Sequence, residues 1–163
     1  MIKIMGDVNK WKCIYKPCGA KCCTEGRPIT PYDIREIRGM GYEDFYRFDK
    51  KDRTFRLIGK DDNNACVFLK PDFSCEIRKN APLICRLVPF EIDKVSYADE
   101  PFIYLKPMTI CPGYDQGDRL DKEFRNSIEE CAMKFIREGQ VLQRKLKDEK
   151  FDAESWVITE KDG

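Results

Sequence analysis

The chain contains no histidine, and this absence excludes several kinds of functional site. Without an imidazole there is no Ser-His-Asp or Cys-His nucleophilic catalysis, no histidine acid–base chemistry and no histidine metal ligand. Any bound metal must therefore be held by cysteine thiolates, with Asp and Glu carboxylates as the only charged alternative.

Long apolar runs and an excess of charge of one sign are also missing. No uncharged stretch approaches the roughly 18 residues of a membrane span, and residues 1–7 lack the apolar segment of a secretory signal. Thirty basic residues balance 29 acidic ones, so the net charge of +1 offers no general attraction to nucleic acid or an anionic membrane. We therefore expect a cytoplasmic protein that binds neither of them.

Cysteine, in contrast, is frequent, with nine among 163 residues. This is below the roughly 8–10% of a disulfide scaffold, and cytoplasmic thiols stay reduced, so clustered cysteines indicate metal or redox chemistry. The high proportion of charged residues, 36%, favours a heat-adapted source for the protein. Intracellular disulfides are known in hyperthermophiles, so a disulfide framework stays open as an alternative.

Local patterns predict short helices and strands over the first two-thirds of the chain. Thr30-Pro31-Tyr32-Asp33 is typical of a helix start, so a helix is expected to run to about Arg38 and to end at Gly39 or Gly41. A second short helix is expected at 42–48. Strands are expected within 1–12, at 54–58 and 66–69 as a hairpin around the turn-forming residues 61–64, and at 90–92 and 102–105.

The clearest predicted element is a long amphipathic helix from about Arg119 to Lys147, with Asp118 as its N-cap. These elements predict an α+β fold: a small, loop-rich, metal-stabilised domain spanning residues 1–148, with short strands and hairpins and a long C-terminal helix. Residues 149–163 are expected to form a polar tail, of which 156–158 can dock onto the domain.

Eight of the nine cysteines precede this helix and form the candidate metal site. They are Cys13, Cys18, Cys22, Cys23, Cys66, Cys75, Cys85 and Cys111. Soft thiolates select zinc, Cu(I) or iron–sulfur clusters, and the resulting anionic sites attract nearby cations. The candidate cations are Lys12, Lys16, Lys21, Arg78, Lys79 and Arg86. Disulfides and simple core packing remain the alternatives for this set.

Two cysteines carry additional information through their positions. Cys22 and Cys23 are adjacent, and in an extended segment their side chains leave opposite faces. This spacing predicts two centres of four sulfurs each, one on either side of the pair. Cys131, the ninth cysteine, lies on the apolar stripe of the long helix and is predicted to be a core residue.

The arrangement resembles the YkgJ-like cysteine-cluster family of zinc- or iron-chelating domains. The matching stretches are Cys18-Gly19 to Cys22-Cys23, Gly26, Ile29-Thr30, Asp33-Ile34, residues 66–69, residues 75–77, residues 82–90 and Cys111-Pro112-Gly113. Arg78 replaces a tyrosine of the family pattern, and the first cysteines are more widely spaced. The resemblance implies metal binding by the eight cysteines, and it includes a distant similarity to flagellin lysine N-methylase, whose cysteine motif is associated with an iron–sulfur centre.

Two functions follow as hypotheses. The first is an iron–sulfur centre, expected to be [4Fe–4S] in all-cysteine ligation, that supports a redox or methyl-transfer protein partner. The alternative is a non-enzymatic zinc module with four-thiolate sites that serves structure, interaction or metal chelation. The chain has no Gly-rich cofactor loop, no Walker A motif and no radical-SAM cysteine spacing, so no catalytic residue and no enzyme activity is assigned.

Overall fold

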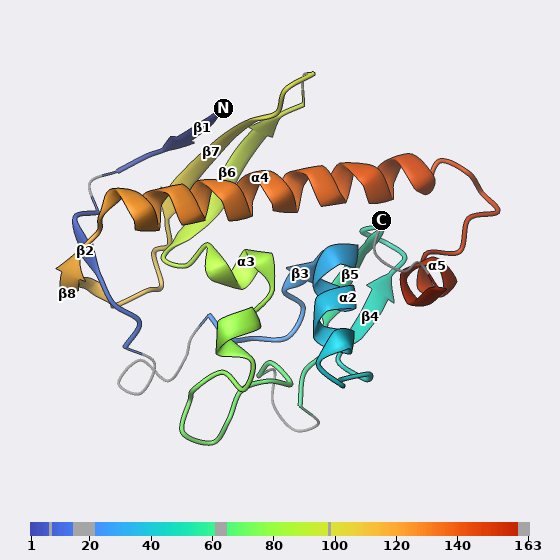
Figure 1. The fold of residues 1–163 in the computed structure, drawn as a ribbon, viewed down its shortest axis with the longest axis horizontal. Helices are drawn as coiled ribbons and strands as arrows, with labels where there is room; N and C mark the ends of the chain where they lie inside the picture. Colours follow the sequence, from blue (N-terminus) through green and yellow to red (C-terminus); the bar gives the residue numbers. More distant parts are fainter. Residues whose placement is uncertain (7, 15–21, 61–64, 98, 160–163) are drawn as a thin grey trace.

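The computed structural model describes all residues except 7, 15–21, 61–64, 98 and 160–163. Helices and small sheets are mixed along the described chain, which confirms the expected α+β class. One long helix, α4 (Lys122–Lys145), runs across the molecule and contacts elements on both sides of it (Figure 1). No helix in the described ranges is long and apolar enough to cross a membrane.

The larger sheet lies against the N-terminal half of α4. Its strand order is β1-β7-β6, formed by β1 (Ile2–Ile4), β7 (Phe102–Pro107) and β6 (Phe90–Ser96). β1 runs parallel to β7 at one edge, whereas β6 and β7 form an antiparallel hairpin. The strands expected within 1–12, at 90–92 and at 102–105 are therefore confirmed.

A second sheet lies below α4 and has the order β3-β5-β4 (Figure 1). It consists of β3 (Pro28–Ile29), β5 (Thr54–Leu57) and β4 (Tyr46–Asp49), all antiparallel. The short helix expected at 42–48 is wrong, because β4 occupies that segment. The rings of Tyr46 and Phe48 pack on Phe55 of the neighbouring strand, and this cross-strand packing outweighs a weak local helix preference.

The expected hairpin of 54–58 with 66–69 is present only in part. β5 forms its ladders with β3 and β4, and the later segment contacts the first through an isolated bridge between Gly59 and Cys66. The predicted turn at 61–64 lies outside the described residues. A third, two-stranded sheet pairs β2 (Lys10–Trp11) with β8 (Tyr114–Arg119).

The predicted start of the first helix is confirmed. α2 (Pro31–Gly39) begins with a capping box in which Thr30 and Asp33 satisfy each other's backbone N–H groups. For α4 the cap is Asp121, whose carboxylate accepts a 2.8 Å hydrogen bond from the Phe124 amide. Asp118 is not the cap, because β8 extends through Arg119 before the helix begins.

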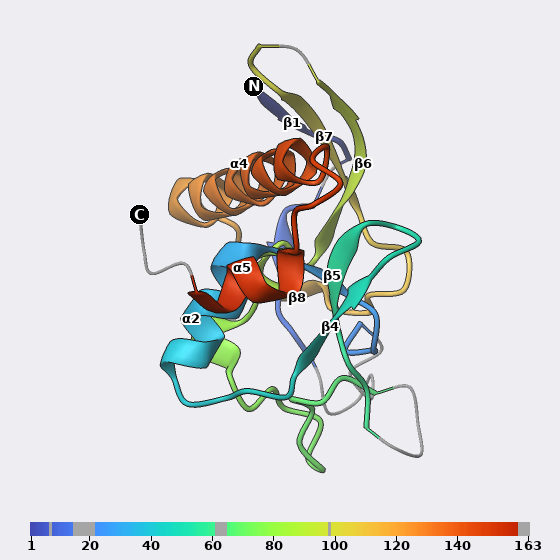
Figure 2. The same cartoon turned by 90° about the vertical axis from the view of Figure 1, so that its right-hand side faces the viewer.

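Three further helical segments lie between α2 and α4 or follow α4. The 3-10 turn η1 (Arg78–Asn80) leads into the short helix α3 (Leu83–Arg86), which packs on α4. α5 (Ala153–Thr159) lies beside α2 (Figure 2). The expected polar tail is thus a packed helix over this range: Val157 is buried and Trp156 packs on the core, while Ile158 is 53% exposed.

Two apolar cores result, and α4 contributes to both. The first core lies among α2, the β3-β5-β4 sheet and α5, and includes Leu142 of α4. Its buried members are Ile29, Ile34, Ile37, Phe45, Phe55, Leu57, Cys66, Phe68, Ile77, Leu142, Ala153 and Val157. The second core lies between the β1-β7-β6 sheet, α3 and α4. Its buried members are Val8, Leu83, Ile84, Leu87, Phe90, Ile103, Leu105, Ile128, Cys131, Ala132 and Ile136.

Candidate metal centre

Six of the eight candidate cysteines line one cavity of about 250 Å³. They are Cys13, Cys22, Cys23, Cys66, Cys75 and Cys85. The segments that carry them follow β2, precede β3, cross the loops after β5 and end on α3. Apolar side chains and three arginines complete the lining, so the fold gathers thiols that are up to 72 positions apart in the chain (13 to 85).

The segment containing Cys22 and Cys23 is held against the second sheet by backbone hydrogen bonds. The Cys66 amide donates to the Cys23 carbonyl at 3.1 Å, and the Gly26 amide donates to the Leu57 carbonyl at 2.8 Å. Gly26 has a φ of +80°, a conformation that a side chain disfavours, and it turns the chain from the cysteine pair into β3. The pair is therefore placed beside Cys66 by the backbone itself.

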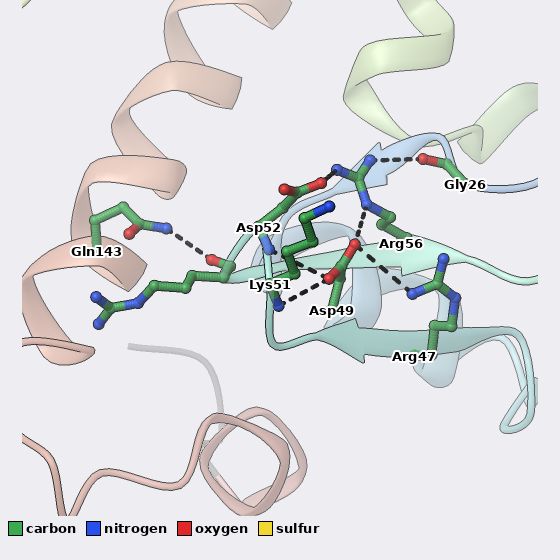
Figure 3. Close-up of polar contacts among 8 residues, drawn as sticks. Gly26, Arg47, Asp49, Lys51, Asp52, Arg56 and Gln143 are labelled. Atoms are coloured by element: carbon green, nitrogen blue, oxygen red, sulfur yellow. Dashed lines mark hydrogen bonds and ion pairs between the residues drawn. The ribbon is translucent and has the colours of Figure 1, made fainter.

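A polar network on the second sheet holds the same turn (Figure 3). Arg56 donates to the Gly26 carbonyl at 2.8 Å, to Asp49 at 2.9 Å and to Asp52 at 2.5 Å. The Asp52 amide and Arg56 keep the pKa of Asp49 below its usual value. Gln143 of α4 donates to a backbone carbonyl in the β4–β5 turn at 2.8 Å. The network thus links the turn after the cysteine pair to the second sheet and to α4.

Cys66 and Cys75 lie in a loop whose amides point at their sulfurs. The Phe68 amide donates to the Cys66 sulfur at 3.5 Å, and the Ile77 amide donates to the Cys75 sulfur. An isolated bridge between Leu69 and Cys75 closes the loop. Such amide–sulfur hydrogen bonds stabilise thiolates when they bind a metal.

Cys85 is placed by α3, and α3 is tied to the cap of α2. The Asp33 carboxylate accepts from the Thr30 amide at 2.8 Å and from the Leu83 amide at 2.9 Å. One side chain therefore satisfies orphan N–H groups at the starts of two helices. Burial raises the pKa of Asp33 above its usual value, while these hydrogen bonds oppose the shift.

The thiols of the cavity differ in their protonation. The Cys23 thiol donates a hydrogen bond to Cys22 and Arg27 lies nearby, and together they lower the pKa of Cys22 to about 6 despite its burial. Burial raises the pKa of Cys66 and Cys75, and it raises that of Cys85 to about 12. Metal binding to the buried thiols must therefore displace protons.

The expectation that Cys22 and Cys23 point to opposite faces is wrong. Their side chains are hydrogen-bonded to each other, and both line the same cavity. Cys22 lies in a turn rather than in extended backbone, so the alternation of a strand does not apply. The geometric argument for two centres, one on each side of the pair, is thereby removed.

The remaining cysteines occupy three different situations. Cys111 lies outside the lining, but its sulfur accepts a 3.3 Å hydrogen bond from Trp11 Nε1, and Trp11 is a lining residue. Cys18 lies outside the described residues. Cys131 is buried in the second core, where it accepts a hydrogen bond from Arg86, so its prediction as a core residue is confirmed.

The gathered thiols do not form a ready site for a single ion. Among the described residues, no three His, Cys, Asp or Glu side chains are grouped closely enough to hold one metal ion. The six cysteines instead line a shared cavity. This arrangement can enclose a group larger than one ion, with thiolate ligands on several sides.

Three arginines line the same cavity, namely Arg27, Arg78 and Arg86. Arg78 and Arg86 were expected near the ligands, whereas Arg27 was not predicted from the sequence. Its position four residues after Cys23 was the available signal, and the positive φ of Gly26 explains how the chain turns it into the cavity. Lys12 and Lys79 do not belong to the lining, and Lys16 and Lys21 lie outside the described residues.

Comparison with known proteins agrees with this geometry. Residues 12–132 match the CxxCxxCC family, which is described as "Putative zinc- or iron-chelating domain". The match includes all eight candidate cysteines and ends after Cys131. No curated protein and no solved structure matches the chain.

Proposed function

Because the chain belongs to the CxxCxxCC family of zinc- or iron-chelating domains, we propose that its cysteine-lined cavity holds an iron–sulfur centre. The proposed ligands are drawn from Cys13, Cys18, Cys22, Cys23, Cys66, Cys75, Cys85 and Cys111. The centre serves a protein partner in a redox or methyl-transfer reaction. No residue of this chain is assigned a catalytic role.

The size and shape of the cavity carry the proposal. Four thiolates bind a zinc ion at about 2.3 Å and close around it, which leaves no free space between them. Here six cysteines line a cavity of about 250 Å³, and the described residues provide no single-ion site. A cluster that adds several irons and inorganic sulfides fills such a space better than one zinc ion does.

The lining also has the charge and the donors that a cluster requires. An all-thiolate centre is anionic, so it is stabilised by cations and by N–H donors around its sulfurs. Three arginines and the amides of Phe68 and Ile77 occupy these positions. The Arg27 Nε–H is buried and has no hydrogen-bond acceptor among the described residues, which fits a cavity that receives its acceptor with the bound group.

When bound, an iron–sulfur cluster supplies one-electron transfer at a potential set by its surroundings. The chain's own residues hold the centre and place N–H donors beside it. Trp11 connects the lining to the Cys111 sulfur, and its ring packs on Phe124 at 5.9 Å between ring centres. We place the contact with the redox partner at the open side of the cavity.

Anaerobic purification, followed by metal and sulfide analysis and a visible spectrum, tests the proposal. We expect a brown protein that contains iron and acid-labile sulfide and loses its colour on oxidation. Reconstitution of the metal-free protein with iron and sulfide should restore the same spectrum. A colourless protein with stoichiometric zinc, isolated without oxygen and unable to take up iron and sulfide, would overturn the proposal in favour of the zinc module.

A further inference from the structure

Arg27 lines the cavity, where its Nη2 is hydrogen-bonded and its Nε has no hydrogen-bond acceptor among the described residues. It precedes β3, and its Nη2 donates to the Ile84 carbonyl on α3 at 3.2 Å. Its Nε is buried, and no described residue offers it an acceptor. A buried donor without an acceptor destabilises a fold. The unsatisfied Nε–H of Arg27 therefore indicates an acceptor that belongs to a bound group.

Arg27 shares the cavity with cysteines from three separate segments of the chain. It lines the cavity together with Cys22, Cys66 and Cys85, which lie before β3, after β5 and on α3. A single cation that lines the cavity with all three lies where these segments meet. A group bound among these sulfurs is therefore within the field of Arg27.

The other two arginines of the lining are placed differently. Arg86 uses its Nε to donate to the Ala81 carbonyl at 2.6 Å, and it also donates to Cys131 in the second core. Arg78 is exposed. Within the described lining, Arg27 is therefore the arginine with a buried N–H still available to a bound group.

We propose that Arg27 is the positioning residue of the metal centre, with its Nε–H donating to a sulfur atom of the bound cluster and its charge offsetting that of the thiolates. This inference rests on the proposed iron–sulfur function. The bond from Nη2 to Ile84 fixes the guanidinium plane, so that the Nε–H is held ready before the centre arrives. A sulfur atom of the bound centre would accept this hydrogen bond, whereas in the metal-free protein no described residue accepts it.

The inference is tested by comparing three variants of Arg27 in metal-free and reconstituted protein. Arg27→Met removes charge and donors, Arg27→Gln removes the charge and retains an N–H donor, and Arg27→Lys retains the charge but loses the fixed Nε–H. The matched control is Arg47→Met, because Arg47 is an arginine of β4 with a side chain 55% exposed, outside the cavity lining.

The two forms of the protein should respond differently. Metal-free Arg27→Met should unfold at about the same temperature as the metal-free parent, because the lost hydrogen bond to Ile84 is offset by the removal of an unsatisfied donor. The reconstituted variant should lose its iron about 10–100-fold faster to a chelator, as expected when a residue that supports metal ligands is removed. Arg27→Lys and Arg27→Gln should fall between Arg27→Met and the parent.

The reduction potential separates charge from hydrogen bonding. Removing a cation beside the cluster favours the oxidised, less negative form, so Arg27→Met and Arg27→Gln should have lower midpoint potentials than the parent. Arg27→Lys should stay closer to the parent, and Arg47→Met should not shift it.

Three outcomes would overturn the role of Arg27. The first is that all three variants retain iron as well as the parent does and have the same reduction potential. The second is an equal loss of stability in the metal-free and the reconstituted forms, which would show a purely structural arginine. The third is a parent protein that binds zinc and does not bind iron and sulfide. This result would overturn the proposed function itself, and it is observed before any variant is made.

Discussion

The cavity wall, meaning the segments that carry the six lining cysteines, and the second core both contain cysteine, but they are built differently. The second core rests on the continuous β6–β7 ladder and on the face of α4, and its Cys131 is packed among apolar side chains. The cysteines of the cavity wall are carried mainly by turns, isolated bridges and the single turn of α3, and they line a shared space. Here a long helix buries Cys131 as an apolar group, whereas loops and a short helix present thiols to the cavity.

The difference has an energetic consequence. Ladders and an apolar helix face stabilise the second core without any bound group. The cavity wall has few ladder hydrogen bonds, and burial raises the pKa of Cys66, Cys75 and Cys85 in the metal-free state. The wall should therefore depend on the metal for much of its order, and the second core should not.

The largest expected effect comes from replacing one cysteine in each region with serine. Cys75→Ser should abolish the bound centre, because it removes a thiolate ligand from the cavity wall. The matched Cys131→Ser should retain full metal content, because that sulfur lies in the second core. Iron, zinc and sulfide analysis of both purified proteins gives the answer. Full metal content in Cys75→Ser, or its loss in Cys131→Ser, would contradict the division of the cysteines.

Metal removal should loosen one region and leave the other intact. After chelation we expect amide hydrogen exchange to accelerate by about 100-fold or more in residues 22–27 and 66–77, where few backbone hydrogen bonds lie in regular structure. Strands β6 and β7 and the N-terminal half of α4 should keep their protection. Hydrogen-exchange mass spectrometry with and without metal measures both regions at once. A uniform increase over the whole chain would show that the regions are not independent.

A smaller effect is expected at Asp33, which joins the start of α2 to the start of α3 through the amides of Thr30 and Leu83. Asp33→Ala should lower the free energy of unfolding by about 1–3 kcal/mol, because it leaves buried N–H groups without an acceptor. Chemical denaturation of the metal-free protein measures the change. The exposed N-cap substitution Asp121→Ala is the control, and its cost should be no larger than about 1 kcal/mol.

The pH dependence of stability provides an independent test of the same side chain. Because burial raises the pKa of Asp33, the folded state binds its proton more tightly than the unfolded state does. The stability from this titration is fully present below the ordinary aspartate pKa of about 4 and is lost as the pH rises through the higher folded value. Asp33→Asn should remove that part of the slope. An unchanged slope would contradict the raised pKa.

The smallest effect is expected from the network on the second sheet. Arg56→Met should weaken metal retention by about tenfold or less, because its ion pairs are only partly buried and the Gly26 turn keeps its backbone hydrogen bond to Leu57. Its effect should decrease further at high salt. Metal retention against a chelator at two salt concentrations provides the measurement. A loss as large as that of Cys75→Ser would place Arg56 in the metal site itself.

The sequence was a good guide wherever a structure depends on near neighbours in the chain. The capping box of Thr30 and Asp33, the end of α2 at Gly39 and the apolar stripe of α4 all rest on residues a few positions apart. The prediction of a helix at 42–48 was wrong because the strand there is stabilised by β5, which lies elsewhere in the chain. The prediction of Asp118 as the N-cap was wrong because β8 pairs with β2, so the helix begins only after Asp121.

Residue types by themselves determined that any metal site in this chain is built from thiolates or carboxylates without histidine, and the helical period determined that Cys131 belongs to a helix face. Both conclusions follow from side-chain chemistry and from the period of the helix, which need no knowledge of distant contacts. Tertiary structure alone decided that Cys22 and Cys23 share one cavity, that six thiols surround it and that Arg27 lies among them. Those facts depend on how loops far apart in the chain dock on the second sheet and on α3, and docking is set by long-range packing and backbone hydrogen bonds.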